Sequence, residues 1–94
     1  MENRELDALI SVHVFGMTPE DAKAILALPH YSTRIEDAWK ILEVLGLSFE
    51  IEYAPGRYTC RIVLDSGDDA RLASGSTASS AICRAALKLK GIAW

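Results

Sequence analysis

The sequence predicts an α+β fold in which three helices are followed by a three-stranded antiparallel meander and a last helix packed on the sheet (ααα-βββ-α). Up to Gly46 the apolar residues recur at intervals of three and four, as in amphipathic helices, whereas from Ser48 they alternate with polar residues, as in half-buried strands. After the strands, an alanine-rich run returns to helical spacing. Since 94 residues suffice for one hydrophobic core, we expect a single domain over residues 1–94.

The first two helices are marked by their capping residues. Asn3 is a suitable N-cap, and the apolar stripe that follows it ends at Gly16. The stripe consists of Leu6, Leu9, Ile10, His13 and Val14. A hydroxyl cap at Thr18 and a proline at the first helical position, Pro19, then predict a second helix over residues 18–28.

The other two helices have equally clear ends. Thr33 and Glu36 have the spacing of a capping box, and Gly46 is suited to the left-handed conformation that closes many helices. The stripe between them consists of Ile35, Ala38, Trp39, Leu42 and Leu45. Ser76 or Thr77 is expected to cap the last helix. Its inner stripe, before Gly91, consists of Ala78, Ala81, Ile82, Ala85, Ala86 and Leu89.

The strand register follows from matching residues across the predicted turns. A four-residue loop at 54–57 joins strands 48–53 and 58–64, and a turn at 65–69 leads to strand 70–74. The expected pairs are Phe49 with Ile62, Ile51 with Cys60, Tyr53 with Tyr58, Glu50 with Arg61, Leu64 with Ala70, and Ile62 with Leu72. This register places Phe49, Ile51, Tyr53, Cys60, Ile62 and Leu72 on the buried face beneath Trp39 and Ile82, and Arg71 and Ala73 on the outer face.

No catalytic, metal-binding or nucleotide-binding motif occurs in the chain. His13 is expected at the boundary of the core, and Cys60 and Cys83 are expected to be structural thiols, since they have no CxxC partner. The acidic turn at 65–69 has Ser76 where an EF-hand would need a glutamate, and glycine-rich phosphate loops are absent. We therefore expect no enzymatic activity, no cofactor and no metal.

Direct nucleic-acid binding and membrane insertion are also not expected. The net charge is −3, and the last helix has no basic residue before Arg84, unlike the lysine-bearing helix of double-stranded RNA-binding domains. The longest apolar runs are far shorter than the roughly 20 residues that span a bilayer. The acidic start of the chain is unlike a secretory signal, so a cytoplasmic location is expected.

The charges are unevenly distributed along the chain. Residues 1–52 hold ten acids and four bases, whereas residues 53–94 hold three acids and six bases. The acids expected on the exposed surface include Glu36, Asp37, Glu43, Glu50, Glu52, Asp65, Asp68 and Asp69. Such a surface serves either to keep the protein soluble or to dock on a basic surface of a partner protein.

Several segments carry a family resemblance. They are residues 6–9, 14–16, Tyr31-Ser32-Thr33 leading into Ala38-Trp39, and Ala81–Lys88. With these segments the chain resembles the small phage and prophage proteins of the phage ABA-sandwich domain family. The resemblance implies an origin in a phage or mobile element, and it transfers no catalytic residues. The family name implies helices on both sheet faces, whereas the strand alternation favours one covered face.

The resulting hypothesis is a monomeric, non-enzymatic protein that binds a host protein in the bacterial cytoplasm. It would act as a counter-defence inhibitor of the anti-CRISPR kind, docking its acidic surface on a nucleic-acid-binding effector such as a CRISPR effector complex. The alternative is a structural or assembly module of a phage particle or replication complex, which would bind through the apolar surface around Trp94 or the edge strand 70–74.

Overall fold

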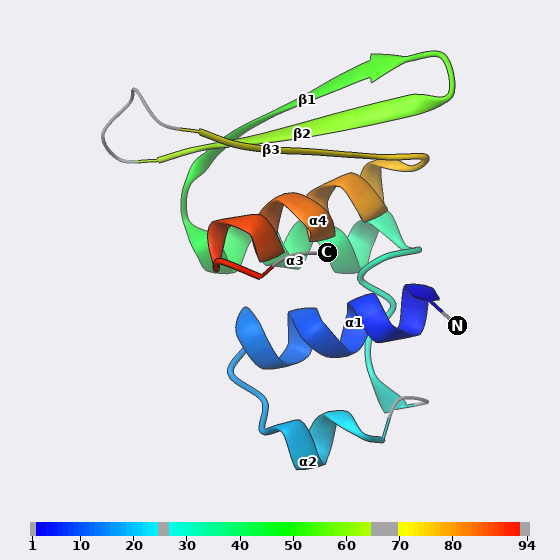
Figure 1. Cartoon of the computed structure of the whole chain (residues 1–94), viewed down its shortest axis with the longest axis vertical. Helices are drawn as coiled ribbons and strands as arrows, with labels where there is room; N and C mark the ends of the chain where they lie inside the picture. The colour runs from blue at the N-terminus through cyan, green and yellow to red at the C-terminus, as the bar shows by residue number, and fades with distance from the viewer. Residues whose placement is uncertain (1, 25–26, 65–69, 93–94) are drawn as a thin grey trace.

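The computed structural model describes residues 2–24, 27–64 and 70–92 and has the predicted element order. The helices are α1 (Glu2–His13), α2 (Pro19–Ala22), α3 (Ile35–Leu45) and α4 (Ala78–Leu89), and the strands are β1 (Ser48–Ala54), β2 (Arg57–Val63) and β3 (Ala70–Gly75). Figure 1 shows α3 and α4 against one face of the sheet, with α1 and α2 beyond them. Among the described residues the helices therefore cover one sheet face, as the alternation predicts.

Two of the predicted helix starts are confirmed. Thr77 caps α4 in a capping box with Ser80, whose backbone N–H donates to the Thr77 hydroxyl at 3.1 Å. Thr18 caps α2 through the Asp21 N–H, but α2 has only four residues instead of the predicted eleven. The backbone beyond it forms i→i−3 bonds, with Lys23 N–H donating to the Glu20 carbonyl, so the α-helical pattern is not continued.

The predicted start of α3 is wrong, whereas its predicted end is confirmed. Arg34, not Thr33, occupies the N-cap position of α3 and makes no side-chain capping bond. Asp37, in the first turn, instead accepts a hydrogen bond from the backbone N–H of His30 at 2.9 Å. Gly46 closes the helix in the left-handed conformation, with φ of 66°.

The register of β1 with β2 is confirmed at every predicted pair, but that of β2 with β3 is shifted by one residue. Leu72 pairs with Arg61, and Ala73 pairs with Cys60. A one-residue shift exchanges the two faces of a strand, so Ala73 packs on the core while Leu72 is 47% exposed on the outer face. Arg71 pairs with Ile62.

The close approach of α4 to the end of β3 explains the shift. A Cβ atom at Gly75 would lie 2.1 Å from the Ser80 hydroxyl oxygen and 3.0 Å from the Ala81 nitrogen. Only small residues therefore fit on the inner face at this end of β3, where Gly75 and Ala73 occupy the inward positions. Leucine on this face would separate β3 from α4.

The core is organised around α4, which packs against β2 and β3 on one side and against α1 and α3 on the other. The buried apolar residues of this helix are Ala81, Ile82, Cys83, Ala85, Ala86 and Leu87.

The predicted burial of Tyr53 and Trp39 is wrong, since Tyr53 is 66% and Trp39 is 44% exposed. Figure 1 shows the reason for Tyr53, because the β1–β2 hairpin extends past the ends of the helices. His13 is also exposed rather than at the core boundary.

A buried ion pair attaches α1 to the segment between α2 and α3. Asp7 is completely buried, and its carboxylate accepts hydrogen bonds from Arg4 Nη1 at 2.6 Å and from the Ser32 backbone N–H at 2.8 Å. Arg4 Nη2 also donates to the Leu28 carbonyl at 3.1 Å. The Ser32 hydroxyl donates to the Asn3 carbonyl at 2.9 Å, so both chain segments are joined by charged and neutral hydrogen bonds.

Replacing Asp7 by asparagine should lower the free energy of unfolding by about 3 kcal/mol, because it removes the completely buried carboxylate that accepts the charged hydrogen bond from Arg4. Glu20→Gln is the matched control. It removes the exposed Glu20–Lys23 pair and should change the free energy by less than about 0.5 kcal/mol. Urea unfolding measures both variants. Equal, small effects would show that the buried pair does not hold the helices together.

The two cysteines are buried where the sheet meets α4. Burial raises the pKa of the Cys60 thiol from 9.0 to about 11, and burial together with the nearby Asp7 carboxylate raises the pKa of the Cys83 thiol further. Both thiols therefore stay protonated at neutral pH. Because the thiolate is the reactive form, neither cysteine is suited to nucleophilic catalysis or to redox chemistry.

The raised pKa of Cys60 predicts a loss of stability at alkaline pH. The Cys60 thiol of the unfolded chain releases its proton near pH 9, whereas that of the folded chain releases it only near pH 11. The contribution of the protonated thiol to the free energy of unfolding is therefore fully present below pH 9 and is lost by about pH 11. The expected loss is about 2 kcal/mol, and Cys60→Ala should show a correspondingly shallower decline. Urea unfolding between pH 8 and 11 tests this window. Parallel declines in both proteins would contradict the assignment to Cys60.

Candidate protein-binding surface

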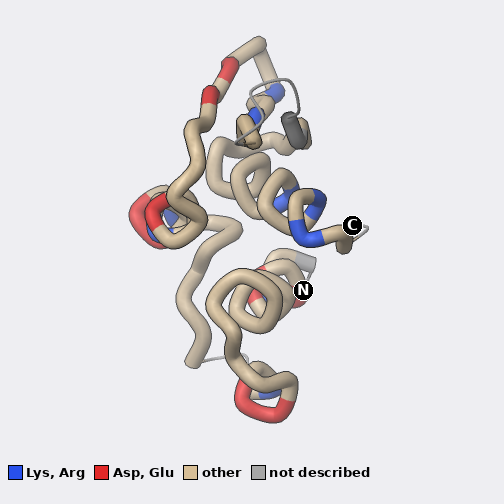
Figure 2. Tube along the Cα trace, turned by 90° about the vertical axis from the view of Figure 1, so that its left-hand side faces the viewer, with Lys and Arg blue, Asp and Glu red and all other residues tan. Residues whose placement is uncertain are grey.

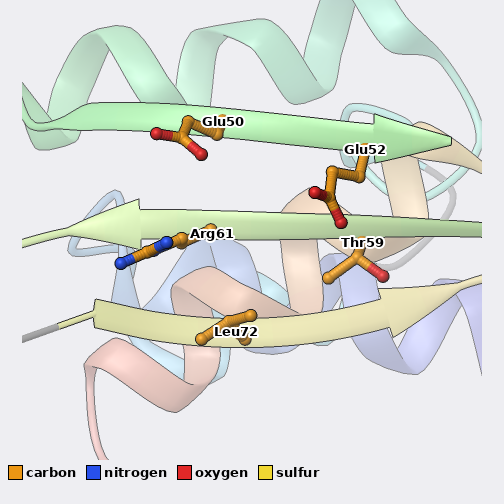
Figure 3. Close-up of a pocket in the computed structure, with 5 residues that line it drawn as sticks. All are labelled: Glu50, Glu52, Thr59, Arg61 and Leu72. Atoms are coloured by element: carbon orange, nitrogen blue, oxygen red, sulfur yellow. The ribbon is translucent and has the colours of Figure 1, made fainter.

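The face of the sheet that points away from the helices carries a hollow of about 260 Å³, and the residues that line it are drawn in Figure 3. We refer to the residues that line it as the outer sheet face: Glu50, Glu52, Thr59, Arg61 and Leu72. The strand register sets Glu50, Arg61 and Leu72 in one row across the sheet. In the next row the Thr59 and Ser74 hydroxyl oxygens lie 3.0 Å apart.

The two glutamates of this face are available to a partner. Glu50 is paired with Arg61 in the backbone register, yet their side chains form no ion pair within 4.0 Å in the described part of the chain. Figure 3 shows the side chains of Glu50 and Glu52 extending from β1 on the outer face. Each carboxylate can therefore accept hydrogen bonds from a basic side chain without first breaking an internal bond.

The other predicted acids fall into three groups. Glu36 and Glu43 are exposed on α3, whereas Asp37 is occupied by the His30 N–H and lies 3.7 Å from Lys40 Nζ. The positions of Asp65, Asp68 and Asp69 lie outside the described residues. Figure 2 shows the acids of β1 and α3 along one side of the molecule and the basic residues of α4 toward the other side. The uneven charge of the sequence is therefore also a separation in space.

Several apolar residues of α3 and β1 that the sequence assigns to the core are partly or largely exposed. Ile35 and Trp39 of α3 are each 44% exposed, and Phe49 and Ile51 of β1 are half-buried. The Trp39 and Phe49 rings meet edge to face with centroids 5.2 Å apart, which places α3 beside β1. We refer to Ile35, Trp39, Phe49, Ile51 and Tyr53 as the β1–α3 strip. The signal that could have found it is the position of β1 at the sheet edge, because one side of an edge strand lacks a covering neighbour.

The other candidate sites have fewer polar and charged groups. Among residues 2–24, 27–64 and 70–92, no three His, Cys, Asp or Glu side chains gather closely enough to hold a metal ion. A wider, mainly apolar groove of about 420 Å³ separates α1 from α2, lined in part by Leu9, Val12 and Ala22. None of the described helices has the length and apolar character needed to cross a membrane.

Comparisons with known proteins agree with the fold. A phage protein from Bacillus cereus ATCC 14579 has a similar crystal structure, with a TM-score of 0.76 and 26% sequence identity over 93% of this chain and 90% of that chain. No curated protein matches the sequence. The family model of the Phage ABA sandwich domain matches residues 8–87, which is most of the chain. This small phage protein is therefore a member of the Phage ABA sandwich domain family.

Proposed function

We propose that this phage protein is a non-enzymatic inhibitor that docks its acidic side on a nucleic-acid-binding surface of a host protein. The target class is a bacterial defence effector, such as a CRISPR effector complex, whose basic surface normally holds nucleic acid. The observation that carries the proposal is the gathering of exposed carboxylates from β1 and α3 on one side of the molecule (Figure 2). Carboxylates there would compete with phosphates for the same lysines and arginines.

The apolar strip supports a protein partner over a purely electrostatic role. Exposed acids alone are common on soluble proteins, and they serve to keep them in solution. Here Glu36 and Glu43 share α3 with the exposed Ile35 and Trp39, and Glu50 follows Phe49, whose ring contacts Trp39. Aromatic side chains at the centre of a surface with charged residues around them are typical of protein-binding sites.

The alternative function, a structural or assembly module that binds through the edge of β3, has less support. Lys88 Nζ of α4 donates a hydrogen bond to the Leu72 carbonyl at 3.2 Å. A lysine at a strand edge opposes pairing with another strand, because the added strand must displace a charged group. Trp94, the other element of that alternative, lies outside the described residues.

Charge reversal tests the proposed inhibitor. The double variant Glu50→Lys/Glu52→Lys should bind a purified defence effector at least about tenfold more weakly, and the loss should be largest at low salt. Glu20→Lys/Asp21→Lys on α2 is the matched control, with the same change of charge outside the acidic surface of β1 and α3. Biolayer interferometry over a salt series measures both variants.

The outcome also separates the two functions. Equal binding of both variants at all salt concentrations would overturn docking through β1. Failure of the wild-type protein to bind any effector complex that holds nucleic acid, together with association into larger particles in light scattering, would favour the assembly module.

A further inference from the structure

The outer edge of β1 is an incomplete part of the sheet. The strand order β1-β2-β3 leaves this edge without a partner strand among the described residues. The inner-face residues Phe49 and Ile51 are only half-buried, whereas their register partners Ile62 and Cys60 on β2 are buried. In a complete sheet, a neighbouring strand would cover the exposed flank of these side chains.

The helical layer extends beyond the same edge. Figure 3 shows α3 running alongside β1 on the side away from β2, and the contact between the Trp39 and Phe49 rings confirms that the two elements are neighbours. The apolar residues Ile35 and Trp39 are four positions apart on α3, so they lie on one face of the helix, and both remain 44% exposed. Exposed apolar side chains on α3 and an unpaired edge on β1 therefore occur together among the described residues.

We infer that the edge of β1 binds an extended segment of the partner protein as a fourth strand of the sheet, which deepens the proposed function and rests on it. The segment would alternate apolar residues with lysine or arginine. Its apolar side chains would pack beside Phe49 and over Trp39, while its basic side chains would lie on the outer sheet face beside Glu50 and Glu52. Backbone hydrogen bonds supply affinity in this mode of recognition, and the alternate side chains supply specificity.

Charge complementarity selects this occupant over a second copy of the chain. Antiparallel pairing of two β1 strands about Ile51 would set Glu50 of each copy opposite Glu52 of the other. Four carboxylates would then meet on one face, and like charges directly opposite each other destabilise a sheet. Pairing of β1 with the β3 edge of a second copy is also disfavoured. Lys88 donates a hydrogen bond to the Leu72 carbonyl at that edge, and the incoming strand would have to displace this charged group. The carboxylates equally disfavour nucleic acid, which is an anion.

A synthetic peptide matched to β1 in length, in which lysine alternates with valine, tests strand addition. The peptide should bind saturably, shift the emission of Trp39 to shorter wavelength in a Trp94→Phe background, and slow amide hydrogen exchange within residues 48–54. A counterpart with the same side chains but N-methylated backbone amides should bind at least about tenfold more weakly, because it cannot donate to β1. A peptide in which glutamate replaces lysine should not bind.

Matched variants separate this inference from the proposed function. Glu50→Lys/Glu52→Lys should abolish binding of the lysine–valine peptide, whereas Glu20→Lys/Asp21→Lys should leave it unchanged. Equal affinity for the methylated and unmethylated peptides, or binding without slower exchange in β1, would overturn strand addition while leaving electrostatic docking in place. Conversely, peptide binding by a protein that binds no defence effector would sustain the strand site and overturn the inhibitor function.

Discussion

The buried carboxylate of Asp7 is the constraint on which the arrangement of the helices depends. A charged group without solvent access is tolerated only when its oxygens are fully bonded, and here Arg4 and the Ser32 backbone N–H supply the bonds. Because Arg4 also donates to the Leu28 carbonyl, the segment leading into α3 cannot leave α1 without breaking hydrogen bonds to both members of this buried ion pair. The stacked rings of Phe15 and Tyr31, with centroids 4.9 Å apart, close the same junction. Burial, together with the carboxylates of Asp37 and Asp7, raises the pKa of the Tyr31 hydroxyl, which remains protonated.

This junction places α1 on one side of α4 while the sheet lies on the other, so α4 is covered on both sides. Small side chains make that possible, since Ala81 and Ala85 take little room and Gly75 allows β3 to approach. The consequence for function is that α4 has few surfaces left for a partner. The proposed binding surface therefore lies on the sheet and on α3, whose outer sides are uncovered in the described part of the chain.

Much of this fold follows from the sequence because several independent signals agree. A single register of β1 with β2 places apolar residues opposite apolar residues and also places Glu50 opposite Arg61. A shift by one residue would break the apolar pairs and this charge pair together. Strand β3 offers only Leu72 as a large apolar residue, and local matching placed it inward. The clearance that α4 requires at Gly75 is a tertiary condition that pairwise matching does not contain.

Asp7 was missed because its partner Ser32 lies 25 residues away, although its position three residues before Ile10 puts it on a buried helix face. The acids Glu36, Glu43, Glu50 and Glu52 were recognisable as exposed from their spacing alone, but their gathering on one side depends on how α3 lies against β1.

The position of α4 also accounts for the difference between the two edges of the sheet. This helix packs beneath β2 and β3, and its Lys88 reaches the edge of β3, whereas β1 meets α3 through the rings of Phe49 and Trp39. Strand β1 therefore combines half-buried apolar side chains on one face with free carboxylates on the other. A partner that satisfies only the carboxylates leaves Trp39 in water, and one that covers only Trp39 must bury apolar surface beside uncompensated charge. The proposed strand of alternating basic and apolar residues would meet both conditions at once, so the chemistry of the edge defines the proposed partner more narrowly than the net charge does.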